Sequence, residues 1–281
     1  MTRHIPIPDL QIRPDAPMDM CWWIGEFIAD KKPDVVVQIG DLYDMHSLSS
    51  YDKGKKSYEG RRYKRDIEAG NVAFAMLNAP IAKEIARLRA NKKKIWTPEL
   101  HFCLGNHEAR IERVVNDEPM LDGAIGYQDF EIPDGWVVHP FLEVVWLDGF
   151  AYSHYFQNQN SARPIGGTAE NRLSKLGCSF FQGHEQGVKI AVQEVPKGRR
   201  WGFVHGAAYL HDESYRGRQS NREKRGIVVL NEVEDGDCDP MLVSLNFLCK
   251  KYEGVGVDEF VTKKYGSKWA ADRTLDCRGL S

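Results

Sequence analysis

The chain has 281 residues, of which 28% are charged and 42% hydrophobic, a composition that excludes intrinsic disorder and fibrous repeats. Its apolar runs are too short to span a membrane and its first residues lack a secretory signal pattern, so we expect a cytoplasmic protein with no membrane partner. The formal net charge of −2 gives no overall attraction to nucleic acid, so such a partner would have to bind to local basic patches.

The first third of the chain alternates helical and strand patterns. Residues 18–30 predict a helix, and the β-branched run 34–39 predicts a buried strand after it. Residues 66–90 place apolar side chains close to the helical period, and Pro80 should kink or split this helix. Residues 101–104 predict another buried strand, so the order is typical of a layered α/β protein.

Short strands dominate from residue 136 onward. Two turn dipeptides, Asp148-Gly149 and Asp235-Gly236, predict hairpins. The expected strands cover residues 136–139, 143–147, 150–154, 179–182, 188–192, 227–233 and 241–247. No internal repeat or linker divides the chain.

The six cysteines are spread along the chain without a Cys-x-x-Cys pair. This spacing excludes a disulfide framework and a zinc ribbon, so we interpret them as small buried apolar residues. They are Cys21, Cys103, Cys178, Cys238, Cys249 and Cys277.

Polar residues follow five expected strands, one of them the short run at residues 5–8, at the points where these strands end. They are Asp9, Asp41, the segment Gly105-Asn106-His107-Glu108, His154 and His184. Open α/β sheets build their sites at this edge, and Asp, Asn and His are ligands for divalent ions. Each residue alone has a simpler explanation as a turn, a helix N-cap or a core histidine. Their order and shared position favour a metal centre.

In these segments the sequence resembles the calcineurin-like metallophosphoesterases. The family signature is Asp-x-His, Gly-Asp, Gly-Asn-His-Asp/Glu, an isolated His and Gly-His-x-His, in that order. The matching segments are Asp9-Leu10-Gln11, Gly40-Asp41, Gly105-Asn106-His107-Glu108, His154 and Gly183-His184-Glu185-Gln186. They run from residue 9 to residue 186, about two-thirds of the chain, and Gly-Asn-His-Glu is the most specific of them.

The resemblance implies an α/β fold in which two mixed β-sheets flanked by helices form a four-layer metallophosphoesterase sandwich. The catalytic domain would cover residues 1–249, and residues 250–281 would form a tail or a small appendage. Because the signature residues must meet in one site, they are expected to belong to a single domain.

The resemblance also implies a two-metal phosphoesterase, in which two ions activate a water molecule and neutralise phosphoryl charge. His107 would stabilise the transition state or protonate the leaving oxygen, and Glu108 would orient a neighbouring group. The metal ligands carried over from the family are Asp41 as the bridge, Asn106, His154 and His184 at one site, and Asp9, Gln11 and Gln186 at the other.

Two departures from the signature affect the same metal site. Gln11 and Gln186 replace histidines of the family, and an amide oxygen is a poorer ligand for transition metals than imidazole. We therefore expect one tight and one weaker site for divalent ions, with Mn²⁺ ahead of Mg²⁺, Zn²⁺, Fe or Ni. Alternatives are that Glu185 supplies a carboxylate, that the weaker site is absent, or that the chain is a catalytically inactive scaffold.

The expected loops carry short basic clusters interleaved with aromatic residues, a combination that suits phosphate backbones and unstacked bases. Each cluster alone is equally well explained as a solvated loop. The clusters lie at residues 53–56, 61–65, 92–94, 197–200 and 216–225. Residues 53–65 follow Gly-Asp and precede Gly-Asn-His-Glu, so they could form a basic cap over the substrate. The substrate-binding residues expected from it are Lys55, Lys56, Arg61 and Arg62.

These patterns favour a phosphodiesterase or nuclease acting on nucleic acid or nucleotides, similar to the DNA-repair and phage-encoded branches of the family. The alternatives are a protein or small-molecule phosphomonoesterase and a metal-binding interaction module without turnover.

Overall fold

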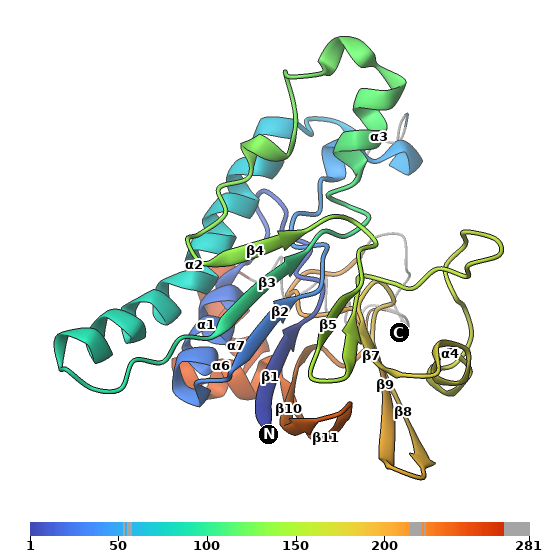
Figure 1. The fold of residues 1–281 in the computed structure, drawn as a ribbon. Helices are drawn as coiled ribbons and strands as arrows, with labels where there is room; N and C mark the ends of the chain where they lie inside the picture. The colour runs from blue at the N-terminus through green and yellow to red at the C-terminus, as the bar shows by residue number, and fades with distance from the viewer. Residues whose placement is uncertain (53, 55–57, 214–220, 222, 267–281) are drawn as a thin grey trace, which may run out of the picture.

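The computed structural model describes residues 1–52, 54, 58–213, 221 and 223–266. As expected from the sequence, it is an α/β protein with two mixed β-sheets flanked by helices (Figure 1). Within the described residues, one sheet contains β11 (Asp237–Ser244), β10 (Gly226–Glu234), β1 (Thr2–Ile7), β2 (Val35–Gln38), β3 (Glu99–Cys103) and β4 (Trp136–His139), in that order. The other contains β5 (Val145–Leu147), β6 (Phe150–Tyr152), β7 (Ser179–Gln182), β9 (Gly198–His205) and β8 (Val188–Val195).

Parallel strands form the centre of each sheet. In the first sheet β1, β2, β3 and β4 run parallel, and β10 and β11 extend it as an antiparallel pair beside β1. In the second sheet β6, β7 and β9 run parallel between the antiparallel edge strands β5 and β8. The predicted ligands come directly after the carboxyl ends of these parallel strands.

The two predicted hairpin turns are confirmed. Asp148 (φ 48°) and Gly149 (φ 84°) connect β5 to β6, and Asp235 (φ 50°) and Gly236 (φ 84°) connect β10 to β11. Positive φ at both positions is what a type I′ turn requires, and Asp-Gly is one of the dipeptides that tolerate it.

Helices cover the outer faces of both sheets. The helix α1 (Asp19–Lys31) packs with α2 (Tyr63–Ala90), α6 (Leu245–Glu253) and α7 (Val257–Tyr265) on the first sheet, and α4 (Ala169–Leu176) packs on the second. The helix α3 (Arg110–Asp117) follows the loop after β3. Short 3₁₀ turns lie at His46–Leu48, Ser50–Asp52, Pro119–Leu121 and Tyr127–Asp129.

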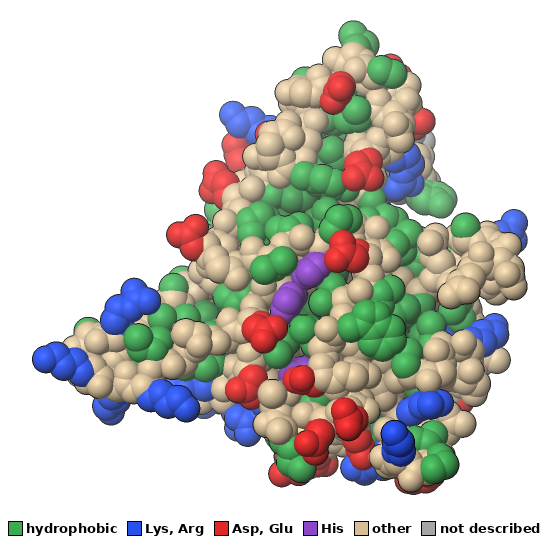
Figure 2. Space-filling view, in the orientation of Figure 1, with side chains coloured by type: hydrophobic (Ala, Val, Ile, Leu, Met, Phe, Trp, Pro, Cys, Tyr) green, Lys and Arg blue, Asp and Glu red, His purple; other side chains and the backbone are tan. Residues whose placement is uncertain are grey.

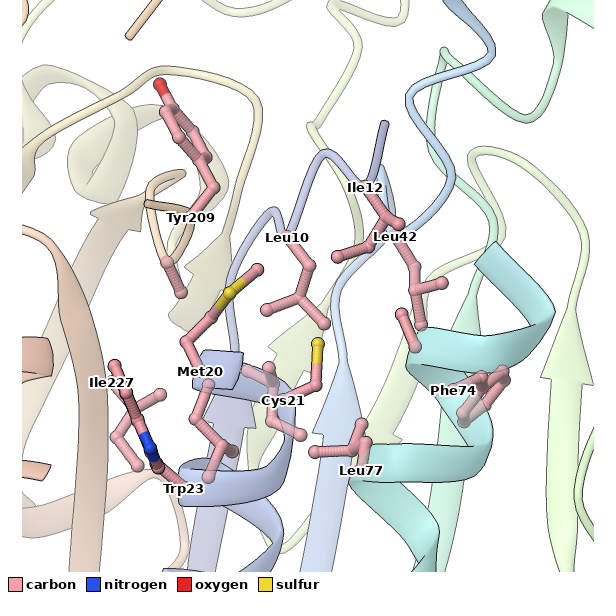
Figure 3. Close-up of a cluster of buried hydrophobic side chains, with 14 of the residues drawn as sticks. Leu10, Ile12, Met20, Cys21, Trp23, Leu42, Phe74, Leu77, Tyr209 and Ile227 are labelled. Atoms are coloured by element: carbon pink, nitrogen blue, oxygen red, sulfur yellow. The ribbon is translucent and has the colours of Figure 1, made fainter. Parts of the chain in front are cut away.

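Apolar clusters between the layers hold the fold together. The largest joins α1 and α2 to the first sheet and includes Trp23 and Leu77 (Figure 3). A second cluster lies between the two sheets, and a third joins the second sheet to α4. Leu10, Ile12 and Leu42 extend the largest cluster from the loops that follow β1 and β2. Their burial anchors these loops at the sheet edge.

Several element boundaries differ from the sequence prediction. The helix α2 continues through Pro80 without being split. The strand expected at residues 241–247 ends at Ser244, because the Ser244 hydroxyl accepts a hydrogen bond from the Phe247 backbone N–H and caps α6. The basic cluster at 197–200 is not a loop, since β9 begins at Gly198.

The described part of the segment after residue 250 packs on α1. The Trp23 ring lies 5.2 Å from the Phe260 ring, edge to face, and the Trp23 indole donates a 2.8 Å hydrogen bond to Glu253. The Tyr252 hydroxyl donates a 2.9 Å hydrogen bond to Asp30. These contacts join α6 and α7 to the main core.

Of the cysteines, Cys21, Cys103, Cys238 and Cys249 are buried and Cys178 is half-buried, all as free thiols, while Cys277 lies outside the described residues. None of the described helices combines the length and the apolar character that crossing a membrane would need.

Candidate metal centre

Four of the predicted ligands meet between the two sheets. Ligand atoms of Asp41, His154 and His184 all lie within 4.8 Å of one another. The Asn106 side-chain oxygen lies 2.8 Å from His154 Nε2 and 2.7 Å from His184 Nδ1. Asp41 follows β2 and Asn106 follows β3, whereas His154 and His184 follow β6 and β7 of the other sheet. The structure therefore brings one carboxylate, one amide oxygen and two imidazoles to a single point.

The orientation of His154 suits metal binding. Its Nδ1 lies 3.0 Å from the Ile39 carbonyl oxygen, so Nδ1 carries the proton that this bond requires and Nε2 faces Asp41 at 3.3 Å. A backbone carbonyl that fixes the tautomer in this way is a common partner of metal-binding histidine. The donor set of two imidazoles with two oxygens suits borderline divalent ions.

Without a metal ion, the charge of Asp41 is balanced by protons on neighbouring histidines. Burial disfavours the charged imidazole of His154, but Asp41 outweighs it and raises the pKa of His154 to about 9. Burial also opposes ionisation of Asp41, yet His107 and His154 hold the pKa of Asp41 well below its usual range. Burial and the charge of His154 lower the pKa of His184 to about 4. A proton on His154 thus occupies the place at which a cation would neutralise Asp41.

Asp9 lies beside this group. Both of its carboxylate oxygens lie 3.1 Å from the His184 backbone nitrogen, which donates to them. Burial, with a further contribution from Asp41, raises the pKa of Asp9 to about 7. An added Cβ at Gly183 would lie 2.2 Å from Asp9 Oδ1, so glycine is required for this close approach. A buried carboxylate in such a position fits a cation ligand.

Gln11 has a buried acceptor without a partner. The residue is 2% exposed, and its side-chain oxygen forms no hydrogen bond with any described residue. The loops of Gln11 and Asp41 are joined because the Gln11 backbone N–H donates a 2.8 Å hydrogen bond to the Asp41 carbonyl. An unsatisfied buried oxygen two residues after Asp9 fits a hard cation, so the chemistry of these residues fits a second metal.

The other two residues of the motif after β7 are used differently. Glu185 forms ion pairs with Arg172 and, at 2.6 Å, with Lys189. Its carboxylate therefore binds these two cations and does not take the place of a histidine at the centre. Gln186 lines a cavity of about 580 Å³ together with Glu223 and Lys224.

The ligand loops carry unusual backbone conformations. Gln11, Asp41 and His184 have φ values of 42°, 52° and 66°, in the left-handed region that few residues other than glycine adopt. Such conformations persist only where the surroundings enforce them, and they cluster at functional sites.

Glu108 holds the ligand loops in place. Its carboxylate is fully buried and accepts hydrogen bonds from the backbone N–H groups of Asp41 (3.0 Å), Tyr43 (2.8 Å) and Gly105 (2.8 Å). Burial, and then the nearby Asp41 charge, raise the pKa of Glu108 to about 7. The last residue of the Gly-Asn-His-Glu motif thus orients the loop backbones, while the His107 ring pairs elsewhere.

A buried ion network around His107 was not expected from the sequence. His107 Nδ1 lies 2.7 Å from Asp44 Oδ1, and His107 Nε2 lies 3.6 Å from Asp41 Oδ2. Asp44 also pairs with Arg13, which in turn donates to Glu213 at 2.6 Å. Burial opposes the charge on His107, but Asp41 and Asp44 raise its pKa. The sequence signal for Asp44 is its position three residues after Asp41, at the same sheet edge.

The predicted substrate-binding residues divide into two groups. Lys55 and Lys56 lie outside the described residues. Arg61 and Arg62 line a cavity of about 340 Å³ together with Arg13 and Arg65. Arg61 also donates a 2.8 Å hydrogen bond to the His46 carbonyl oxygen. A basic cavity therefore lies next to the network of Arg13 and Asp44.

The other basic clusters lie elsewhere. The segment at 92–94 follows the end of α2, a helix of 28 residues that separates it by about 40 Å from Arg61 and Arg62. Figure 2 shows Lys and Arg side chains along this outer end of α2 and acidic side chains around the lower ends of the sheets. In the 216–225 cluster, Arg225 is buried, and its guanidinium lies over the Tyr209 ring. The basic side chains at the outer end of α2 are therefore remote from Arg61 and Arg62.

No family model matches the chain. It is similar to the Gene 54 protein of Mycobacterium phage D29, with 27% identity over 202 residues that cover 66% of this chain and 71% of that protein. The name of that relative describes no activity.

Proposed function

We propose that this protein is a metal-dependent phosphoesterase of the calcineurin-like type, and that it hydrolyses phosphodiester bonds of nucleic acid or nucleotides. The convergence of Asp41, Asn106, His154 and His184 between two sheets carries this proposal. The layering of helices, two mixed sheets and a further helix is compatible with the metallophosphoesterase sandwich.

Two sets of residues would bind two divalent ions, of which we expect Mn²⁺ first. Asn106, His154 and His184 would hold one ion together with Asp41, and Asp9 and Gln11 would contribute to a second, weaker site shared with Asp41. When bound, such ions supply Lewis acidity toward phosphoryl oxygens and lower the pKa of a coordinated water. The protein keeps the ligand atoms in place through buried loops whose backbones are fixed by Glu108.

His107 is the group that we assign to proton transfer. Its Nδ1 is held by Asp44 at 2.7 Å, which leaves Nε2 directed toward Asp41 and the centre. Asp41 and Asp44 raise the pKa of His107 against the effect of burial, so these carboxylates favour the protonated ring. A proton on Nε2 can pass to the leaving oxygen as the phosphoester bond breaks.

The surroundings of the centre favour a diester over a monoester. A phosphomonoester needs only a pocket for one phosphoryl group. A phosphodiester in a nucleic acid has nucleotides on both sides, and these need further binding surfaces beside the centre. In the neighbouring cavity Arg61 and Arg62 suit contact with a further phosphate, whereas Arg13 and Arg65 in the same wall are paired with Asp44 and Asp15.

Hydrolysis of bis-p-nitrophenyl phosphate and of p-nitrophenyl phosphate in the presence of Mn²⁺, Mg²⁺ or Zn²⁺ tests the proposal. We expect the diester to be hydrolysed and Asp41→Asn to abolish turnover, while Asp122→Asn, a matched change at an exposed position, leaves it unaltered. Turnover of the monoester alone would indicate a phosphatase. No turnover with any of these ions would indicate an interaction module, and full activity of Asp41→Asn would contradict the bridging role.

A further inference from the structure

A cavity opens directly beside the metal ligands. It has a volume of about 500 Å³, and Asn106 and His184 form part of its wall. Volumes of this order accommodate small organic ligands in known sites. Whatever occupies this cavity therefore lies next to a phosphoryl group at the centre.

Aromatic rings form one side of this cavity. The Tyr155 ring lies 5.0 Å from the His184 ring and 5.9 Å from the His154 ring. The Phe141 ring lies 5.6 Å from Tyr155 at an interplanar angle of 81°. Because Tyr155 directly follows His154 in the chain, its position is tied to a ligand of the centre. Tyr51, which is 81% exposed, also lines the cavity.

Cationic side chains complete the lining. Arg110 and Arg113, both on α3, line the cavity with one acid, Glu112. The Arg110 guanidinium is held in place by a 2.8 Å hydrogen bond to the Asp44 carbonyl oxygen. Arg113 is exposed and forms no ion pair with the described residues, so its charge is available to a ligand. Aromatic faces beside guanidinium groups are the combination on which unstacked bases bind.

The two cavities flank the same carboxylate. Arg13 of the basic cavity pairs with the Asp44 side chain, and Arg110 of the aromatic cavity donates to the Asp44 backbone. A strand bound at the centre would therefore have aromatic rings near it in one cavity and the arginines at positions 61, 62 and 65 in the other.

From these contacts we infer that the cavity of Tyr155, Phe141 and Arg113 binds the nucleobase next to the scissile phosphate, so that the substrate is single-stranded nucleic acid. The inference rests on the proposed function and specifies its substrate class. A base inside a duplex is stacked and paired and cannot contact these rings, whereas an unpaired base can lie against them.

The first test compares two p-nitrophenyl diesters that differ in the presence of a base. Thymidine 5′-(p-nitrophenyl phosphate) carries a base, whereas methyl p-nitrophenyl phosphate has only a methyl group in place of the nucleoside. The ratio of their kcat/KM values reports base binding, and Tyr155→Ala should lower it by about 10- to 100-fold, as expected for the loss of one stacking contact. Tyr155→Phe, which keeps the ring, should retain the ratio. Trp146→Ala, an exposed aromatic on β5 outside the cavity, should also retain it.

The second test measures binding without turnover. Fluorescence anisotropy of labelled oligonucleotides with the full chain should show tighter binding of single-stranded than of duplex DNA, with Tyr155→Ala and Phe141→Ala weakening the former. Single-stranded RNA in the same assay identifies which sugar is preferred. Thermal unfolding of each variant establishes that it is folded.

The outcomes separate the inference from the proposed function. If both diesters are hydrolysed, and neither their ratio nor oligonucleotide binding responds to Tyr155→Ala and Phe141→Ala, the base site is refuted while the phosphodiesterase stands. If no diester is hydrolysed but single strands bind through Tyr155, the base site stands and the enzymatic proposal fails. Preferential binding and cleavage of duplex DNA would overturn the inference.

Discussion

One methyl group at Gly105 should displace the central ligand of the site. A Cβ atom at this position would lie 2.2 Å from Asp41 Oδ1 and 2.4 Å from the Asp41 backbone nitrogen. Ordinary non-bonded contacts are about 3.5 Å, so in Gly105→Ala the Asp41 carboxylate must move by about 1 Å. Glu108 bonds the backbones of both Asp41 and Gly105, so the two loops cannot separate without losing these hydrogen bonds.

The expected effect falls on both function and stability. Misplacement of a reacting group by about 1 Å costs about 100-fold in rate, and overpacking of a buried position lowers the free energy of unfolding by about 1–3 kcal/mol. We therefore expect Gly105→Ala to remain folded, to bind Mn²⁺ more weakly and to hydrolyse bis-p-nitrophenyl phosphate about 100-fold more slowly.

The assay combines Mn²⁺ titration followed by electron paramagnetic resonance, steady-state kinetics and thermal unfolding. Gly166→Ala is the matched control, because a Cβ atom there meets no described atom within 4 Å and the residue does not require positive φ. Unchanged Mn²⁺ affinity and turnover in Gly105→Ala would refute the claim that close packing positions Asp41.

Three further predictions concern the same centre. Asp44→Asn should lower kcat for the diester by about 100-fold, because His107 loses the carboxylate that orients it. An unaltered kcat in steady-state kinetics would exclude this orienting role of Asp44. Gln11→His should raise the affinity for the weaker metal, because imidazole is a better ligand than an amide oxygen for a transition metal, and calorimetry that finds two equally tight sites in the unaltered protein would contradict the asymmetry. Between pH 7.5 and 9, metal binding should release about one proton from His154, whose pKa of about 9 keeps it protonated below that pH. The affinity for the metal should therefore rise about tenfold per pH unit and level off above pH 9. Calorimetry in buffers of different ionisation enthalpy measures the proton release directly. Equal binding heats in these buffers would argue against it.

Much of the candidate metal centre could be predicted because its residues follow strands with strong local patterns. The β-branched run of β2 is buried along its whole length, and Asp41 comes shortly after it. The parallel order of the strands then requires their carboxyl ends to meet. Gln11 and Gln186 were identified only by departure from a motif, so the sequence indicated which residues differ but not where their side chains lie.

The residues around His107 could not be predicted, because their partners are distant in the chain. Arg13 and Glu213 are 200 positions apart, and neither belongs to a motif or a periodic pattern. The cavity of Tyr155 and Phe141 was missed for a similar reason, since each aromatic residue alone is an ordinary component of a strand end or loop. The strand β9 is absent from the strands expected from the sequence, and at its start Arg199 and Arg200 resemble a solvated loop, although Arg199 pairs with Asp237 on β11.

The loop after β7 explains why the two halves of the centre differ. It offers three consecutive donors, but only His184 contributes to the group of Asp41 and His154. Glu185 is held by Arg172, a fully buried arginine of α4 whose charge would otherwise lack compensation. The half beside Asp9 therefore depends on carboxylate and amide oxygens, which suit hard ions, while the other half has two imidazoles, which suit borderline ions. The unequal affinity that we expect for the two metals thus follows from the ion pair that holds Glu185 as much as from the glutamine at position 11.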